Sequence, residues 1–292
     1  MSSSEPLIGV AAALAAKGTT PARPTMPAIY QQFSLPDRVA LITGGNGGLG
    51  LEAALAFLEA GARAVYCVDL PAQPSEAWTA VKDYAAATGL SGRLEYIQGD
   101  VTIQQTMWNI AQDIGDKEGR LDVCVAGAGI SDKAAPPLEY MAEDYDKIVD
   151  INLKGVLYTA QAAGRQMTRF GTPGSIILMA SVAGLIATKG LLMTGYYATK
   201  GGVINLMRSL AVELAEKNIR VNSLAPGFIW TPMVSGAIDG KKEVEEFFRI
   251  QNPMQRIGKP HEIRGPMVWL ASDASSYSTG SNIEVSGGYS AW

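Results

Sequence analysis

Histidine and cysteine are scarce in this chain of 292 residues, which holds one histidine and two cysteines. A metal site built from several histidines is therefore excluded, and a nucleophile–histidine–acid triad would depend on His261 alone. Since His261 follows Pro260 where a helix is expected to begin, we expect it to have a capping or surface role. Cys67 and Cys124 lie in short apolar runs typical of buried strands. They favour reduced core thiols in a cytoplasmic protein over a disulfide or a catalytic cysteine.

Long apolar runs and basic clusters are also missing. The longest apolar candidate, residues 7–16, is shorter than the roughly 20 residues that span a bilayer. It has Glu5 rather than a basic segment before it, so we expect neither a signal peptide nor a membrane partner. The net charge is −4, and lysine and arginine form no stripe that would neutralise the phosphates of a duplex. Nucleic acid is therefore not an expected partner.

The chain is rich in apolar residues: 47% are hydrophobic and 18% are charged, which predicts a globular protein with a large core. Residues 1–36 differ, because they contain Ser2-Ser3-Ser4 and several spaced prolines. They predict a flexible or loosely docked N-terminal extension, in which a short helix over 7–17 is one alternative. Residues 37–292 are then expected to form a single domain.

From Arg38 onward, short apolar runs alternate with longer segments of helical periodicity. This alternation predicts βαβ units and an α/β fold, a doubly wound parallel sheet of about seven strands with helices on both faces. Ligands of such sheets bind at the carboxyl ends of the strands. The expected strands are 39–43, 64–69, 94–98, 123–127, 175–179, 220–225 and 282–285. The expected helices include 48–61, 74–87, 102–117, 142–170, 196–217 and 260–272.

The first expected strand leads into a helix through the glycine-rich turn Thr43-Gly44-Gly45-Asn46-Gly47-Gly48-Leu49-Gly50. Glycine permits positive φ and close backbone approach, and a helix N-terminus offers free N–H groups and a positive dipole end. This order of elements predicts a site for the diphosphate of a dinucleotide. The pattern fits two registers, Gly45-x-Gly47-x-x-Gly50 and Gly44-x-x-x-Gly48-x-Gly50. A purely structural turn is the competing interpretation.

Asp69 ends the second expected strand about 20 residues after the turn, where dinucleotide-binding folds place an acid on the adenosine ribose hydroxyls. A carboxylate there would repel a 2′-phosphate. Neither the turn nor Leu70-Pro71-Ala72 carries an arginine or lysine to receive that phosphate. The sequence therefore favours NAD over NADP, and an ordinary surface acid at a strand end is the alternative.

Two further strand ends carry candidates for the cofactor. Asp100 follows the third strand, where its carboxylate could accept a hydrogen bond from the adenine amino group or cap the helix after Val101. The fourth strand runs into Ala126-Gly127-Ala128-Gly129. These small residues would let a cofactor lie against the backbone, although tight packing alone could require them.

Tyr196 and Lys200 are the candidate acid/base pair. They lie four residues apart where a long helix is expected to begin, so both project from one face. Because an adjacent ammonium stabilises a phenolate, we expect Lys200 to lower the pKa of Tyr196 from its ordinary value of about 10. Tyr196 could then exchange a proton with an alcohol. Tyr197 has Gly201 at the matching position and is the weaker candidate, and a surface Tyr/Lys pair is the alternative.

Two polar residues complete this constellation. Ser181 follows the fifth strand, where its hydroxyl could bind a substrate oxygen or cap a turn. Asn152 falls inside an expected helix, where asparagine has poor propensity. We expect Asn152 to hold a water that relays a proton from Lys200 to solvent.

In order, Thr43-Gly44-x-x-x-Gly48-x-Gly50, Asn152, Ser181, Tyr196-x-x-x-Lys200 and Pro226-Gly227-x-Ile229-x-Thr231 resemble the motifs of the short-chain dehydrogenase/reductase family. The resemblance runs from about Pro36 to the C-terminus. It implies a single Rossmann-type domain, a homotetramer, and a catalytic tetrad of Asn152, Ser181, Tyr196 and Lys200. It also implies that Lys200 contacts the nicotinamide ribose, Ile229 backs the ring and Thr231 binds its carboxamide. The residues expected to bind NAD are Gly44, Asn46, Gly48, Leu49, Gly50, Asp69, Leu70, Asp100, Val101, Ala126, Gly127, Ala128, Tyr196, Lys200, Pro226, Gly227, Ile229 and Thr231.

The chain departs from the family pattern in two places. The family has Asn-Asn-Ala-Gly after the fourth strand, whereas this chain has Ala126-Gly127-Ala128-Gly129 and lacks the asparagine that would steady the central strands. The interval from Ser181 to Tyr196 is slightly long. We expect the loop 188–195 within it to reshape the substrate pocket without loss of chemistry.

These expectations describe an NAD-dependent enzyme that acts on a secondary alcohol or ketone. In oxidation, Tyr196 takes the hydroxyl proton, Ser181 holds the oxygen and the hydride passes to NAD, and reduction reverses these steps. Residues 131–140, 188–195 and 228–256 are expected to select the substrate, the last as a lid. A resemblance to fungal polyol dehydrogenases favours polyols. The mostly apolar set in these segments favours medium-sized apolar alcohols: Met193, Phe228, Trp230, Met233, Phe247 and Phe248.

Other classes of function predict other patterns. An NAD-binding regulatory or scaffold protein would lack part of the tetrad, and a methyltransferase would not need Tyr196-x-x-x-Lys200. An isomerase or dehydratase that uses NAD transiently stays an alternative, and would show no net change in NADH. The last residues, 286–292, are expected to reach a neighbouring subunit or to fold on their own chain.

Overall fold

The computed structural model describes residues 10, 14, 28–238 and 240–291. Its centre is a 7-stranded sheet with the order β3-β2-β1-β4-β5-β6-β7. Every neighbouring pair of strands is parallel. The chain winds outward from β1 to β3, returns to place β4 beside β1, and then winds outward to β7 on the other side. This is the predicted doubly wound sheet.

The strands follow the apolar runs of the sequence closely, with differences of one residue at some ends. β1 and β4 are buried along their whole length because helices cover both faces of the sheet. The strands are β1 (Val39–Thr43), β2 (Ala64–Asp69), β3 (Arg93–Gln98), β4 (Val123–Ala126), β5 (Gly174–Met179), β6 (Ile219–Pro226) and β7 (Asn282–Val285).

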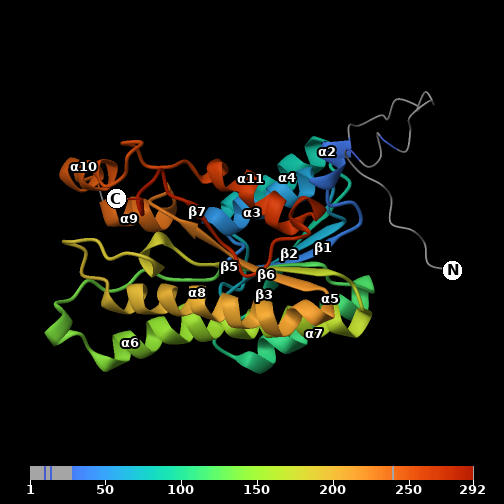
Figure 1. Cartoon of the computed structure of the whole chain (residues 1–292), viewed down its shortest axis with the longest axis horizontal. Helices are drawn as coiled ribbons and strands as arrows, with labels where there is room; N and C mark the ends of the chain where they lie inside the picture. The colour runs from blue at the N-terminus through green and yellow to red at the C-terminus, as the bar shows by residue number, and fades with distance from the viewer. Residues whose placement is uncertain (1–9, 11–13, 15–27, 239, 292) are drawn as a thin grey trace.

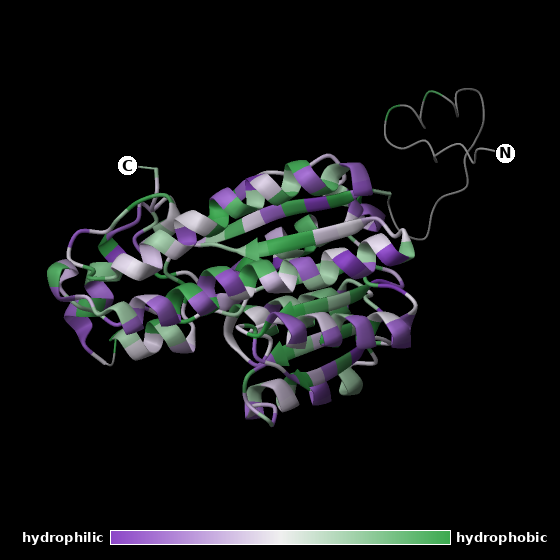
Figure 2. Ribbon diagram, turned by 90° about the horizontal axis from the view of Figure 1, so that it is seen from below, coloured by the Kyte–Doolittle hydropathy of each residue, from purple (hydrophilic) through white to green (hydrophobic). Residues whose placement is uncertain are grey.

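Helices cover the two faces of the sheet as separate layers (Figure 1). One layer holds α3 (Gly48–Glu59), α4 (Glu76–Ala87) and α11 (Arg264–Ala271). The other holds α5 (Gln104–Glu118), α7 (Gly155–Phe170) and α8 (Thr194–Leu214). Each layer closes an apolar core against its face of the sheet. Figure 2 shows the strands as largely hydrophobic ribbons between these amphipathic helices.

Two shorter helices follow β6 at the carboxyl end of the sheet. They are α9 (Pro232–Ile238) and α10 (Lys242–Ile250), and they lie together beyond the strands (Figure 1). The buried side chains of Ile238, Phe248 and Ile257 give them a small core of their own. These helices belong to the segment 228–256, called the lid below.

The expected regular helix over 142–170 is interrupted. α6 (Ala142–Val149) is followed by a π-helical turn, Asp150–Lys154, and only then by α7. The prediction of an unbroken helix is therefore wrong at this turn, which contains Asn152. Such turns often mark functional sites.

The N-terminal extension lies mostly outside the described residues, as does the alternative helix over 7–17. Near its end the chain has a short helix, α2 (Ala28–Gln32). Leu35 is fully buried, and its N–H donates to the carbonyl of Ala60 at 2.7 Å. The extension is thus anchored to the domain just before Pro36. Within the described part of the chain, the helices are too short or too polar to cross a bilayer.

The two cysteines and the histidine lie where the sequence predicted them. Cys67 and Cys124 are free and fully buried. Burial raises the pKa of each thiol to about 12, which makes both inert core residues. His261 is exposed in the short turn Pro260–Ile263 before α11, as a surface role requires.

Candidate active site

The glycine turn joins β1 to α3 at the carboxyl edge of the sheet. Gly44 and Gly48 adopt φ values of +70° and +52°. A Cβ at Gly50 would overlap the carbonyl oxygen of Gly44. The structure therefore requires glycine in the register Gly44-x-x-x-Gly48-x-Gly50. The N-cap residue of α3 makes no side-chain hydrogen bond to the first turn. Free N–H groups at such an end suit a diphosphate.

Small residues after β4 bring two strands together beside the turn. A Cβ at Gly127 would lie 2.8 Å from the carbonyl oxygen of Thr43. The hydroxyl of Thr43 accepts the N–H groups of Gly127 at 3.2 Å and Ala128 at 3.4 Å. This hydroxyl joins β1 to the segment after β4 in a chain that lacks the family's asparagine. Packing by itself therefore accounts for glycine at position 127.

Asp69 lies at the end of β2, directly beside the turn. Its Oδ2 accepts the N–H of Asn46 at 3.1 Å, and its Oδ1 accepts the N–H of Leu70 at 2.9 Å. Asn46 is itself held by Ser75, which donates to its side chain and to its carbonyl at 2.7 Å each. The carboxylate is thus fixed where the sequence pattern expects the adenosine ribose.

Asp100 shapes the turn before α5. Its Oδ1 accepts the N–H of Thr102 at 2.9 Å and the hydroxyl of Thr102 at 2.7 Å, whereas the N-cap of α5 is Ile103. Asp100 is therefore not the helix cap of the predicted alternative, and its contact with the adenine stays a prediction. The side chains of Val101 and Ala126 belong to the core. A contact of these two residues with a cofactor would therefore use their backbone.

Lys200 and Tyr196 lie together on the first turns of α8. The Nζ of Lys200 is 5.5 Å from the ring centroid of Tyr196 and donates to the carbonyl of Met179 at 2.8 Å. Lys200 is buried, with 4% of its surface exposed. The pair is thus held against the end of β5 and is not the surface pair of the alternative interpretation.

Ser181 completes this group from the end of β5. Its hydroxyl donates to the carbonyl of Pro226 at 3.4 Å and accepts the N–H of Ala183 at 3.1 Å. Ser181 therefore caps the short turn that follows it, as the alternative interpretation predicted. It also forms a hydrogen bond with Tyr196. The contact of this hydroxyl with a substrate oxygen stays a prediction.

The pKa of Tyr196 lies above its ordinary value, so the expected lowering by Lys200 is wrong. Burial raises the pKa of Tyr196, and the hydrogen bond with Ser181 offsets part of this rise. Burial also lowers the pKa of Lys200 to about 8, because the charged ammonium is taken out of water. The four-residue spacing correctly predicted that Tyr196 and Lys200 lie close together, but it carried no information on how deeply they are buried.

Asn152 is fully buried in the π-helical turn. Its Oδ1 accepts the N–H of Ile130 and its Nδ2 donates to the carbonyl of Ile130, both at 2.9 Å. A Cβ at Gly129 would lie 3.3 Å from Asn152 Oδ1 and 3.7 Å from Lys200 Nζ. Asn152 is therefore beside the Tyr/Lys pair and ties the helix to the segment after β4. The water relay stays a prediction.

The segment after β6 places the last motif next to the glycine turn. Ile229 is buried and pairs with Gly258 in an isolated bridge. Thr231 accepts the N–H of Val234 at 3.4 Å at the start of α9. Its methyl carbon lies 4.0 Å from the position of a Cβ at Gly48. The first and last motifs, which follow strands in different halves of the sheet, therefore lie next to each other at one edge of it.

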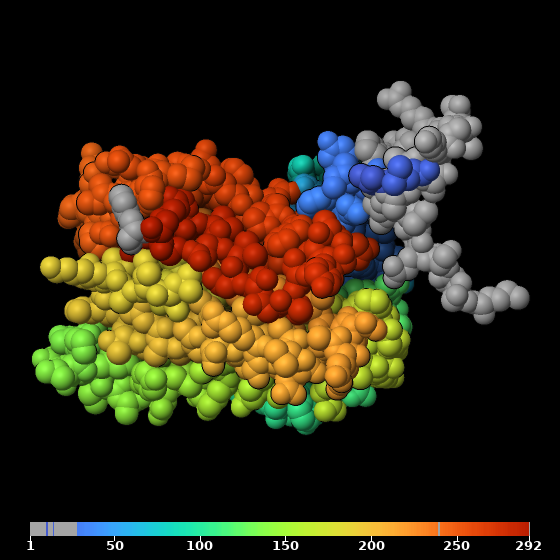
Figure 3. Space-filling view, viewed as in Figure 1, coloured from blue at the N-terminus to red at the C-terminus, as the bar shows by residue number. Residues whose placement is uncertain are grey.

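The sequence pointed to residues 286–292 as a tail that makes contacts, but it gave no signal for the contacts of Tyr289. The Tyr289 ring lies 5.1 Å from that of Phe228, and its hydroxyl contacts Thr188. Figure 3 shows the C-terminal segment, in dark red, between the lid in orange and the loop before α8 in yellow. The tail therefore packs on its own chain through Tyr289, and a contact of the tail with a neighbouring subunit stays a prediction. Contacts between such distant segments leave no local signal in the sequence.

The described residues hold no cluster of three or more His, Cys, Asp or Glu that could bind a metal ion. The chemistry visible at this edge of the sheet is that of a phenol, a hydroxyl and an amine beside a dinucleotide-type turn. That combination is suited to proton exchange with an alcohol oxygen next to a hydride carrier.

Comparison with known proteins agrees with this geometry. Residues 44–290 match a family model described as enoyl-(acyl carrier protein) reductase. D-arabinitol 2-dehydrogenase (ribulose-forming) of Scheffersomyces stipitis is 35% identical, over 90% of this chain and 98% of that protein. Sorbose reductase sou1 of Schizosaccharomyces pombe is 39% identical, over 88% of this chain and 97% of that protein.

A solved structure of a putative 2-deoxy-d-gluconate 3-dehydrogenase from Agrobacterium tumefaciens, with bound NADP, has a TM-score of 0.79. It is 31% identical and covers 89% of this chain and 99% of its own. The residues that match the family model, 44–290, include the glycine turn and the Tyr/Lys pair. The chain therefore belongs to the short-chain dehydrogenase/reductase family of oxidoreductases.

Proposed function

We propose that this protein exchanges a hydride between NAD(H) and a secondary alcohol or ketone, with a polyol or sugar alcohol as substrate. The observation that carries the proposal is the meeting of Ser181, Tyr196 and Lys200 beside the glycine turn. The names of the two fungal relatives support the polyol class. A medium-sized apolar alcohol is the second candidate, because Phe228, Phe247 and Phe248 pack together in the lid.

The residues at the edge of the sheet fit a nicotinamide dinucleotide. The turn at Gly44–Gly50 and the free end of α3 would hold the diphosphate, and Asp69 the adenosine ribose. Lys200 would contact the nicotinamide ribose, with Ile229 and Thr231 at the ring. When bound, the nicotinamide supplies or accepts the hydride. The carboxylate of Asp69, without a basic residue at 70–72, supports NAD in this chain, although the related solved structure holds NADP.

The protein's own groups handle the proton. In oxidation, the phenolate oxygen of Tyr196 takes the hydroxyl proton while the Ser181 hydroxyl donates to the same substrate oxygen. Lys200, whose pKa is lowered to about 8, is able to gain and lose a proton near neutral pH. It would therefore pass the proton onward, and in reduction the same groups act in reverse.

Replacement of Tyr196 with phenylalanine tests this assignment. We expect Tyr196→Phe to abolish turnover, measured as absorbance at 340 nm with NAD and a panel of polyols and apolar secondary alcohols. NADH binding, measured by fluorescence, should persist because the phenol hydroxyl is not part of the dinucleotide turn. Tyr197→Phe is the matched control and should keep turnover. Turnover in Tyr196→Phe would contradict the assignment to Tyr196. Reduction of NADP but not of NAD by the wild type would contradict the assignment to NAD.

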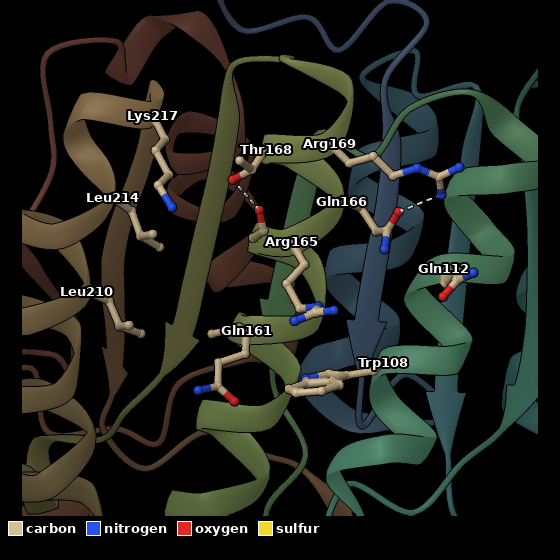
Figure 4. A pocket seen from close by; sticks show the side chains of 12 residues that line it. Trp108, Gln112, Gln161, Arg165, Gln166, Thr168, Arg169, Leu210, Leu214 and Lys217 are labelled. Carbon is tan, nitrogen blue, oxygen red and sulfur yellow. Dashed lines mark hydrogen bonds between the residues drawn. The ribbon is translucent and has the colours of Figure 1, made fainter.

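We also propose a homotetramer, on the evidence of the face formed by α5, α7 and α8. This face has a hollow of about 630 Å³. The guanidinium of Arg165 lies 4.2 Å from the Trp108 ring, whose buried N–H has no acceptor among the described residues. Figure 4 shows Leu210 and Leu214 of α8 facing the same hollow as Trp108. The hollow thus combines apolar side chains with basic and polar ones on neighbouring helices, and such a surface suits a second copy of the chain.

For the chain as a whole, we propose one domain over 37–292 with an N-terminal extension over 1–36. All strands pair in one sheet, which supports a single unit. We also propose a cytoplasmic location. The free, buried thiols of Cys67 and Cys124 support a reducing compartment.

A further inference from the structure

The first turn of α8 receives its cap from another part of the chain. Its N-cap residue, Met193, makes no side-chain hydrogen bond to the turn. The first N–H groups of a helix lack partners within the helix and need acceptors elsewhere. Asp132, in the segment after β4, accepts the N–H of Tyr196 through Oδ2 at 3.1 Å. A carboxylate at this end also interacts favourably with the helix dipole.

The second oxygen of Asp132 is held by Tyr140. The Tyr140 hydroxyl donates to Asp132 Oδ1, and its ring packs edge-on against Tyr145 with 6.2 Å between centroids. Burial and the neighbouring Asp132 carboxylate raise the pKa of Tyr140. The phenol therefore remains a donor at neutral pH, and both oxygens of Asp132 have a fixed partner.

Because Gly195 has no side chain, Asp132 and Tyr140 can approach the backbone of α8. A Cβ at position 195 would lie 2.5 Å from Tyr140 Oη, 2.7 Å from Ile148 Cγ2 and 3.2 Å from Asp132 Oδ2. Any side chain there would push the segment after β4 and α6 away from the first turn. Asp132, Tyr140 and Gly195 thus form one close contact directly beside Tyr196.

We propose that Asp132 is a positioning residue for Tyr196. It fastens the backbone of Tyr196 to the segment after β4 and so keeps the phenol in place beside Ser181. The inference rests on the proposed acid/base role of Tyr196. Displacement of a reacting group by about 1 Å can lower a rate by about 100-fold, so a cap at this position bears on turnover.

The test compares Asp132→Ala and Asp132→Asn with the wild type in steady-state kinetics and in NADH binding. We expect Asp132→Ala to lower kcat by about 10- to 100-fold with an unchanged Kd for NADH. Asp132→Asn keeps an oxygen that can accept the Tyr196 N–H and gains an N–H that can donate to Tyr140. It should therefore restore most of kcat, a rescue that simple loosening of the fold would not give.

Asp144→Ala is the matched control. Asp144 pairs with Lys133 at 3.0 Å and so ties the same segment to α6, and this ion pair does not involve α8. We expect this variant to keep the wild-type kcat. A kcat loss equal to that of Asp132→Ala would show a general effect of loosening the segment and would overturn the positioning role.

Two other outcomes would also overturn the proposal: wild-type kcat in Asp132→Ala, or no recovery in Asp132→Asn. Tyr196→Phe is measured alongside. If Tyr196→Phe is active, the proposed function fails, whereas an inactive Tyr196→Phe with a fully active Asp132→Ala removes the positioning role alone.

If Asp132→Ala does not fold, Tyr140→Phe becomes the test, because it frees one oxygen of the same carboxylate. A lower kcat at unchanged NADH affinity then supports the proposal, and a wild-type kcat overturns it.

Discussion

Tyr196 has to lose its proton before it can take one from an alcohol, and two effects shift its pKa in opposite directions. Burial raises the pKa of Tyr196, and the hydrogen bond with Ser181 lowers it. Ser181→Ala removes only the lowering effect, so the pKa of Tyr196 rises further. We therefore expect the alkaline rise of kcat/KM for alcohol oxidation to move to higher pH in this variant.

A pH profile of kcat/KM measures this shift directly. Ser181→Thr serves as the control, because it keeps a hydroxyl next to Tyr196 and should hold the rise near its wild-type pH. A Ser181→Ala profile that loses amplitude without moving would show that Ser181 binds substrate but leaves the acidity of Tyr196 unchanged.

At the level of single residues, the sequence predicted which residues form the site better than it predicted their surroundings. The spacing of Tyr196 and Lys200 placed both on one helix face, and their contact is confirmed. Spacing cannot report how much water surrounds a group, so the direction of the Tyr196 pKa was wrong. Asp132 and Tyr289 were expected only as members of the segments 131–140 and 286–292, because each acts through a contact with a segment far away in the chain.

Among the elements, the turn around Asn152 joins two parts of the site. Its side chain makes both hydrogen bonds available from the backbone of Ile130. Asn152→Ala would leave that part-buried N–H and carbonyl without these partners. An unpaired buried polar group costs about 1–3 kcal/mol, so we expect the free energy of unfolding to fall by about 2–4 kcal/mol.

Chemical denaturation, followed by circular dichroism, measures this change in unfolding free energy. Asn109→Ala is the matched control, since Asn109 is exposed on α5 and accepts from Gln105 within the same helix. Its effect should stay within about 0.5 kcal/mol. A wild-type unfolding curve for Asn152→Ala would mean that other groups hold Ile130 in place.

The strands were predicted almost to the residue because each is an apolar run that helices bury on both faces. The helix over 142–170 shows where such reasoning stops. Poor helix propensity at Asn152 indicates an irregularity, but the π-helical turn depends on Ile130, which lies in another element. The lid helices α9 and α10 were likewise expected only as a loop segment, because their small core forms between short pieces of chain.

Across the whole molecule, α8 connects the site to the surface proposed for assembly. Its first turns carry Tyr196 and Lys200. Its last turns carry Leu210 and Leu214, which line the hollow. Subunit contact at α8 would therefore stiffen the helix that holds the acid/base pair. The C-terminal tail, by contrast, packs on its own lid through Tyr289 and Phe228.

This difference predicts the effect of two changes on the mass in solution, measured by light scattering. Leu210→Lys adds a cation beside Arg165, Arg169 and Lys217, where the repulsion of like charges opposes a subunit contact, and should reduce the proposed tetramer to smaller species. Truncation after Gly288 removes Tyr289 and the residues beyond it. Because Tyr289 contacts its own subunit, the truncated protein should keep the wild-type mass but bind substrate more weakly, with a higher KM. A truncated chain that dissociates while Leu210→Lys keeps the wild-type mass would place the subunit contact at the tail and not at α8.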